Sequence, residues 1–179
     1  MARTPSHVLS VEAYLEQEAD GRVRHEYVAG EIFAMIGGSV RHNELALRLA
    51  TAFTAHLRGG PCRAYMSDVK VRIKRGMDVS FYYPDVMVSC VPAEHQYYLE
   101  SPKLIVEVLS PTTEAIDRRE KAVQYQLIET LEEYVLVAQD EREVTVFRRS
   151  EDWKPAVHRS GRLELRSIDL ALQIEEIYD

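Results

Sequence analysis

Two short apolar runs, each carrying one carboxylate, constrain this chain more than any other feature. Residues 83–88 and 104–110 are rich in β-branched side chains and have the length of buried strands. The first run contains Asp85 and the second contains Glu107. An ionised carboxylate in a protein core is costly unless a partner or a metal compensates for its charge. A divalent cation between the two carboxylates would remove that cost and create a Lewis-acid site.

Each carboxylate also has a simpler interpretation. Asp85 follows Pro84 and could end a turn, with its side chain bonding to nearby amides. Glu107 could lie on an edge strand and face water. Either explanation suffices for one acid alone, but two acids on successive strands favour a shared site.

The composition is that of an ordinary single domain spanning residues 1–179, with 46% hydrophobic and 28% charged residues. No apolar run approaches the length of a membrane-spanning helix, and no apolar signal core follows Arg3. We therefore expect a cytoplasmic protein that does not contact a membrane. Cys62 and Cys90 match neither a disulfide framework nor a zinc spacing, so we expect two free buried thiols.

A net charge of −7 counts against broad, nonspecific adhesion to nucleic acid, although charge can also act locally. Two basic clusters lie within residues 70–75 and 118–121. Strand alternation would place Lys70, Arg72 and Lys74 on one face. That face could bind nucleic acid, or it could be an ordinary solvated surface.

Helical periodicity predicts three helices. Ser10 can cap the first, over residues 11–18, and the others are expected over residues 40–57 and 114–129. Three apolar side chains are expected on the buried side of the last helix: Ile116, Val123 and Leu127.

Strand patterns fill most of the remaining chain. Gly30 marks a tight turn between two short strands within residues 28–36. Other strands are predicted over residues 63–73, 82–90, 104–109, 134–138 and 144–148, with shorter ones near 154–158 and 163–165 and a final turn at 174–178. The mixture predicts an α/β domain with a mixed central β-sheet flanked by helices, in which 82–90 and 104–109 are neighbours.

The predicted helix over residues 114–129 strengthens the case for a site. Asp117, Lys121 and Tyr125 are spaced by four residues and therefore share one face. Because the helix follows directly after the Glu107 strand, its lysine could reach the carboxylate pair. Alternatively, Lys121 and Asp117 form a surface ion pair that contributes little.

A series of short motifs follows in order from about residue 10 to residue 150. They are Arg24-x-Glu26, Gly30-Glu31-Ile32, Met35, His42, Asp68-Val69, Pro84-Asp85, Glu107-Val-Leu-Ser-Pro-Thr-Thr113, Asp117-Arg118 to Lys121, Tyr125 and Glu133-Tyr134. Together they resemble the Uma-type restriction endonucleases, a large bacterial family within the PD-(D/E)XK nuclease superfamily. The segment that begins at Glu107, with the later Asp-Arg and Lys, is its most specific part.

The resemblance implies a restriction-endonuclease-like core in which Asp85 and Glu107 bind Mg²⁺ or Mn²⁺. The superfamily usually has a lysine two residues after the glutamate, but here that residue is Leu109. Lys121 on the helix would then serve the site. Lys70 is a second candidate, because it stands two residues after an acid, Asp68.

Other residues are secondary candidates. Possible accessory residues of the site are Glu26, His42, Asp68, Asp117 and Tyr125. Possible DNA-binding residues are Lys70, Arg72, Lys74, Arg118 and Arg119. Among the accessory residues, His42 opens the long helix and could face the site or cap the helix.

The residue types suit phosphodiester hydrolysis. Mg²⁺ prefers hard oxygen ligands and keeps several waters, one of which could attack phosphorus. A lysine could orient that water and stabilise the transition-state charge. It could also act as a base if neighbouring positive charge and desolvation lowered its pKa.

Three function classes remain open from the sequence. The leading one is a Mg²⁺-dependent endonuclease that hydrolyses DNA. The alternatives are a non-catalytic nucleic-acid-binding or protein-interaction module on the same fold, and a hydrolase for a small phosphate ester.

A homodimer is also expected. Residues 134–138 and 144–147 form apolar strands that could lie at a sheet edge, and exposed edges invite pairing. Nucleases that cut both strands often act as two-fold dimers, the commonest symmetry of soluble oligomers. The alternative is a monomer whose edge is protected by its own C-terminal tail.

Overall fold

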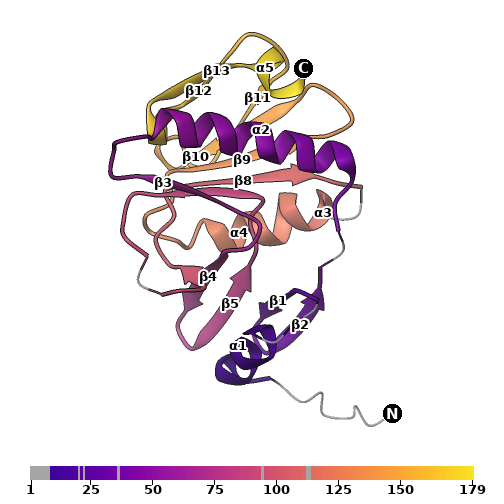
Figure 1. Cartoon of the computed structure of the whole chain (residues 1–179), viewed down its shortest axis with the longest axis vertical. Coiled ribbons are helices and arrows are strands. Elements are labelled where there is room, and N and C mark those ends of the chain that lie inside the picture. Colours follow the sequence, from indigo (N-terminus) through magenta and orange to yellow (C-terminus); the bar gives the residue numbers. More distant parts are fainter. Residues whose placement is uncertain (1–8, 20, 22, 36, 94, 112–113) are drawn as a thin grey trace.

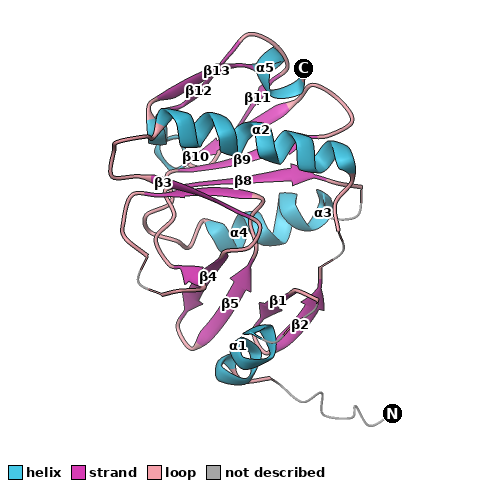
Figure 2. Cartoon of the chain, viewed as in Figure 1, coloured by secondary structure: helices cyan, strands magenta, loops and turns pink. Residues whose placement is uncertain are grey.

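A mixed six-stranded sheet forms the centre of the computed structural model, which describes residues 9–19, 21, 23–35, 37–93, 95–111 and 114–179 (Figures 1 and 2). The strand order is β11-β10-β9-β8-β6-β3. Their bounds are β3 Arg63–Met66, β6 Val86–Ser89, β8 Leu104–Leu109, β9 Glu133–Ala138, β10 Val144–Arg148 and β11 Pro155–His158. β8 and β9 are parallel, whereas β6 and β8 pair antiparallel. The expected α/β class and the expected pairing of these two regions are confirmed.

Helix α2 (Val40–His56) covers one face of this sheet (Figure 1). Its N-cap is Ser39, whose Oγ accepts a hydrogen bond from the His42 N–H at 3.0 Å. Leu45, Leu49 and Phe53 recur every four residues and form one core with the sheet. This packing fixes the first turn of α2, and with it His42, near the ends of the central strands.

A five-stranded sheet with the order β2-β1-β5-β4-β7 lies on the other side (Figure 2). Its strands are β1 His25–Val28, β2 Glu31–Ala34, β4 Lys70–Arg75, β5 Asp78–Tyr82 and β7 Tyr98–Leu99. Val71 and Ile73 of β4 share a second core with Ile105 of β8. Helix α1 (Val11–Ala19) packs Tyr14 on Tyr27 and Phe81. The two sheets are thereby packed against each other.

Two predicted strands are each divided between the sheets. The predicted strand 63–73 is β3 in one sheet and β4 in the other, with a turn in which the Val69 N–H donates to the Met66 carbonyl. The predicted strand 82–90 contains the end of β5 and all of β6. Pro84, which has no N–H to donate to a ladder, lies between them. Asp85 therefore lies where the chain crosses between the sheets.

The predicted helix 114–129 is shorter and irregular, and its predicted buried face is wrong. It comprises α3 (Glu114–Ile116), the π-helical turn η1 (Asp117–Lys121) and α4 (Ala122–Tyr125). The three apolar residues expected to be buried are all exposed: Ile116, Val123 and Leu127. Asp117, Lys121 and Tyr125 are buried instead. The face that carries the site residues is thus the one packed into the protein.

The cysteines form a disulfide, which corrects the expectation of two free thiols. Arg63 of β3 pairs with Ser89 of β6, so Cys62 and Cys90 are the next residues on each strand and meet across the ladder. Pairing between segments 28 residues apart decides this contact.

The C-terminal region contains the strand predicted near 163–165 and adds a partner strand and a short helix that the sequence did not predict. β12 (Arg162–Leu165) pairs with β13 (Leu170–Gln173), and residues 174–178 form the short helix α5 (Ile174–Tyr178) in place of a turn. The expected sheet edge is also wrong, because β9 and β10 are interior strands and β11 pairs with β10. Among the described residues, no helix has both the length and the apolar character needed to cross a membrane.

Candidate active site

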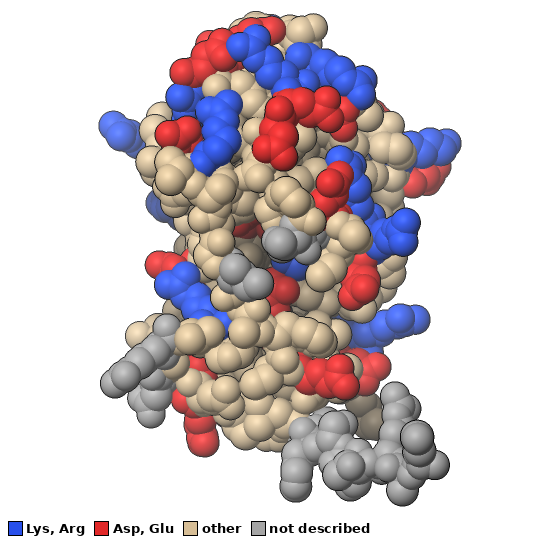
Figure 3. All heavy atoms as spheres, turned by 90° about the vertical axis from the view of Figure 1, so that its right-hand side faces the viewer, with Lys and Arg blue, Asp and Glu red and all other residues tan. Residues whose placement is uncertain are grey.

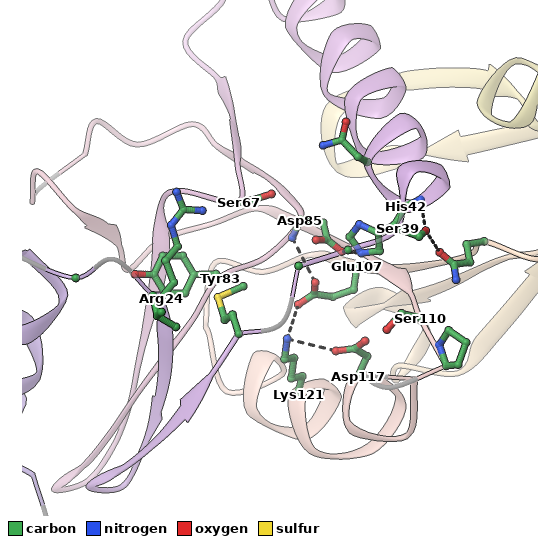
Figure 4. Close-up of a pocket in the computed structure, with 18 residues that line it drawn as sticks. Arg24, Ser39, His42, Ser67, Tyr83, Asp85, Glu107, Ser110, Asp117 and Lys121 are labelled. Carbon is green, nitrogen blue, oxygen red and sulfur yellow. Dashed lines mark hydrogen bonds and ion pairs between the residues drawn. The ribbon is translucent and has the colours of Figure 1, made fainter.

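The two candidate carboxylates line one cavity, located where the chain crosses from the five-stranded to the six-stranded sheet. The cavity measures about 740 Å³, and Lys121 also lines it. Asp85 stands just before β6, Glu107 belongs to β8 and Lys121 ends η1. Figure 4 shows these side chains grouped around the same space. The structure thus brings together the residues that the sequence selected from separate elements.

Alternation along β8 directs Glu107 toward the helical segment. It shares a strand face with Ile105, which packs in the same core as Tyr125. The Tyr125 hydroxyl donates to Glu107 Oε1 at 2.7 Å, and Lys121 Nζ lies 3.5 Å from that oxygen. The Asp85 N–H donates to Oε2 at 3.3 Å. The side chain of Glu107 is only 4% exposed, so these groups largely fix its position.

The negative charge of Glu107 is poorly compensated in this position. Burial raises the pKa of Glu107 well above its ordinary value. Lys121 opposes that shift, whereas the charges of Asp85 and Asp117 reinforce it. A further positive charge beside Glu107 would favour its ionised form.

Asp85 is attached to β8 and α2 through one oxygen. Its Oδ2 accepts the Val108 N–H at 2.7 Å and lies 3.2 Å from His42 Nε2. Its Oδ1 makes no hydrogen bond or ion pair with any residue that the structure describes. The bond to a nearby amide, expected from the simpler interpretation, therefore coexists with a position in the cavity.

Lys121 is surrounded by carboxylates. Its Nζ lies 2.8 Å from Glu26 Oε1, 3.3 Å from Asp117 Oδ1 and 3.5 Å from Glu107 Oε1. Burial alone would lower the pKa of Lys121, but these three acids raise it well above the ordinary lysine value. The condition under which this lysine could act as a base, a pKa lowered by neighbouring positive charge and desolvation, is therefore not met. Lys121 is a fixed positive charge, and the accessory candidates Glu26 and Asp117 hold it in place.

His42 faces the cavity as well as belonging to the first turn of α2. Its hydrogen bond to Asp85 raises its pKa, and burial partly opposes that rise. Gly38 permits this position, because a Cβ at residue 38 would lie 2.8 Å from His42 Nδ1. Of the two sites expected for His42, the one at the carboxylates is observed.

The second candidate lysine lies outside the carboxylate cluster. Lys70 is buried and donates to the Tyr83 hydroxyl at 3.2 Å, and its burial lowers its pKa. It has no ion pair with Asp85 or Glu107 among the described residues. Asp68 is exposed and pairs with Arg24. The acid-x-lysine spacing that suggested Lys70 belongs to a turn followed by a strand of the other sheet.

Most of the predicted DNA-binding cations are already paired with acids. Arg72 lies 2.8 Å from Glu100, and Lys74 lies 4.0 Å from the same side chain. Arg118 lies 2.7 Å from Glu114 Oε1. On the face shown in Figure 3, basic and acidic side chains are interspersed, with no continuous basic surface among the atoms described there. Contact between these residues and DNA stays a prediction.

Several lining residues were not selected from the sequence. Arg24 lies beside Tyr83, with its guanidinium carbon 6.0 Å from the ring centroid (Figure 4). Neutral polar side chains also line the cavity: Ser39, Asn43, Ser67, Ser110 and Gln139. Tyr83 adjoins Asp85 in the sequence and Arg24 belongs to one of the family-like motifs, so both had a signal. The neutral residues come together only through the fold.

The donor set at the cavity suits Mg²⁺ or Mn²⁺. Within the described ranges, no group of three or more His, Cys, Asp or Glu side chains is arranged to hold a metal ion. Mg²⁺ is commonly bound by one or two carboxylates, with waters and substrate phosphates completing its shell. Asp85 and Glu107 provide two such carboxylates, and Asp85 Oδ1 has no described partner. These two residues are therefore suitable ligands.

Comparison with known proteins identifies a matching family, two relatives by sequence and one crystal structure with a similar fold. A family model described as "Uma2: Putative restriction endonuclease" matches residues 11–175. "Uncharacterized protein slr1290" from Synechocystis sp. is 39% identical, over 97% of this chain and 93% of the relative. A second Synechocystis protein, sll1609, is 29% identical over 78% of this chain and 80% of its own length. A crystal structure from Anabaena variabilis, described as a "putative nuclease belonging to DUF820", has a TM-score of 0.70 at 19% identity, covering 86% of this chain and 89% of that one.

Proposed function

The chain belongs to the Uma2 family, and we propose that it is a Mg²⁺- or Mn²⁺-dependent endonuclease that hydrolyses DNA phosphodiester bonds in the cytoplasm. One observation carries the proposal. A carboxylate just before β6, a carboxylate on the neighbouring strand β8 and a lysine from the following helical turn meet at one cavity. This is the combination of hard oxygen ligands and fixed positive charge that phosphoryl transfer requires.

Each residue has a distinct role in the proposed reaction. Asp85 and Glu107 would hold the metal ion, which when bound activates a water molecule and offsets charge on the phosphate. Tyr125 fixes one oxygen of Glu107 through a 2.7 Å hydrogen bond. Lys121 contributes a permanent positive charge, because its raised pKa keeps it protonated. This lysine replaces the residue that the superfamily usually places on the strand, where the chain has the buried Leu109.

The test is cleavage of plasmid and oligonucleotide DNA by the full chain with Mg²⁺, Mn²⁺ or EDTA. Asp85→Ala should abolish cleavage, whereas Asp78→Ala, which removes an exposed acid on β5, should leave it unchanged. Cleavage that survives Asp85→Ala would indicate a contaminant and reject the assignment. Failure to cut any DNA would favour the two alternatives, and turnover of a small phosphate ester would separate them.

A homodimer is a separate proposal. Its original premise is lost, since β11 and not β10 is the edge strand, but two-fold dimers are the commonest soluble oligomers and this still motivates it. Light scattering at micromolar concentration tests it. A mass near the 20.6 kDa of one chain rejects the dimer, and about twice that mass supports it.

A further inference from the structure

The charged groups of the candidate active site are recessed in a half-open pocket. The side chains of Glu107 and Lys121 are 4% and 8% exposed, and that of Asp85 is 16% exposed. A volume of about 740 Å³ lies within the roughly 300–1,000 Å³ range of pockets that enclose a small ligand. A scissile phosphate must come within about 3–3.5 Å of the reacting groups. A duplex carries its phosphates along a stiff helix, so bringing one of them to recessed groups requires the duplex to bend or unstack, whereas a flexible single strand needs neither.

The charge distribution also disfavours a duplex. Duplex-binding proteins neutralise several phosphates at once with lysine and arginine. Here Arg72 and Arg118 are engaged by Glu100 and Glu114, and Lys70 is buried under Tyr83. The net charge of the chain is −7. These three cations are therefore poorly placed to neutralise the phosphates of a duplex backbone.

The rim of the pocket offers different contacts. Arg24 is half exposed, with its side chain 49% accessible, and its described ion pair is with the exposed Asp68. Ser39 Oγ donates to Gln139 Oε1 at 2.8 Å, and both residues line the pocket. One accessible cation with neutral hydroxyl and amide groups suits one backbone phosphate and the unpaired edges of bases. Such base edges are accessible in a single strand.

We propose that the substrate enters this pocket as single-stranded DNA, one phosphodiester at a time, and that Arg24 binds a backbone phosphate at the rim. The inference rests on the nuclease function proposed above and specifies its substrate. A flexible strand can bring a phosphate to the pocket floor without unstacking a helix. A duplex would react only at frayed ends, gaps or other unpaired segments.

The first test compares one labelled oligonucleotide, alone and annealed to its complement, in Mn²⁺. We expect cleavage of the single strand to be at least tenfold faster. Equal or faster cutting of the blunt duplex would overturn the inference while leaving the nuclease assignment intact. Anisotropy with Asp85→Asn measures binding independently of catalysis, and it should show at least tenfold tighter binding of the single strand. If neither DNA is cut, the nuclease proposal fails and this binding ratio still decides the preference.

The second test uses a matched pair of arginines. Arg24 and Arg162 each make a described ion pair with an exposed acid, but Arg162 lies on β12. Arg24→Gln should weaken single-strand binding about three- to tenfold and lower the salt slope by about 0.7, the value for one phosphate contact. Arg24→Lys should restore much of the affinity, and Arg162→Gln should change nothing. Equal effects of the two glutamine variants would overturn the role of Arg24.

Discussion

Replacement of Lys121 by methionine tests whether the site is a cluster of negative charges held together by one buried cation. Lys121 Nζ lies within 3.5 Å of carboxylate oxygens from Glu26, Glu107 and Asp117. Methionine retains much of the side-chain volume but removes the charge. Breaking a buried ion pair by removing one partner costs about 3–5 kcal/mol. For a domain of this size, that cost corresponds to a fall in Tm of roughly 6–20 °C.

The assay is chemical or thermal unfolding of the full chain in EDTA, beside Lys103→Met as a control. Lys103 pairs with Glu132 at 3.4 Å, and both side chains are at least one-third accessible, so its loss should cost roughly 0–1 kcal/mol. Millimolar Mg²⁺ should stabilise Lys121→Met more than the wild type, because a cation bound by the carboxylates replaces the missing charge.

The deficit of Lys121→Met should also depend on pH in one direction. Lys121 opposes the upward shift of the Glu107 pKa, so without it the folded-state pKa rises further above the ordinary value of 4.5. The deficit is then complete above that raised pKa and shrinks as the pH falls through it, because the folded state takes up a proton first. The charge cluster would be refuted if the loss of stability in Lys121→Met were no larger than that in Lys103→Met at every pH, including pH values above the raised pKa of Glu107.

Three further predictions concern the ligands' neighbours. Tyr125→Phe removes a buried donor to Glu107 and should lower the free energy of unfolding by about 1–3 kcal/mol. The variant should stay folded but cleave DNA more slowly than the wild type. An unchanged cleavage rate would contradict the positioning role of Tyr125. The raised pKa of His42 means that it stabilises the metal-free fold fully below about pH 6.5 and loses this effect as the pH rises through the raised value, so the stability difference from His42→Gln should shrink from pH 6 to pH 8.5. Gly38→Ala would place a Cβ against the imidazole, so it should reduce the pH dependence assigned to His42; a wild-type pH profile would show that the ring is not displaced.

The sequence predicted the two central carboxylates because the cost of burying them is visible locally. A strand such as β8, buried on both faces, appears as a continuous apolar run, so Glu107 stands out within it. The helix α2 was predicted within one residue, since its apolar spacing is also a local signal. These features depend on neighbours along the chain and not on long-range contacts.

Long-range pairing explains what the sequence could not predict. Alternation is the same in β3 and β4, so the pattern does not reveal that the chain changes sheet at residues 67–69. The π-helical turn η1 lies in this segment, and the structure buries Lys121 among acids while three apolar side chains are exposed. The disulfide and the covering of β10 by β11 likewise depend on strand register.

Binding of Mn²⁺, followed by electron paramagnetic resonance, tests most directly the claim that Asp85 and Glu107 share one divalent cation. The wild-type chain should bind one Mn²⁺ at the site, and Asp85→Asn and Glu107→Gln should each lose it, because each removes one of the two charged ligands. Glu132→Gln, which alters an exposed acid, should bind Mn²⁺ as the wild type does. Undiminished binding by folded Asp85→Asn and Glu107→Gln would contradict the account.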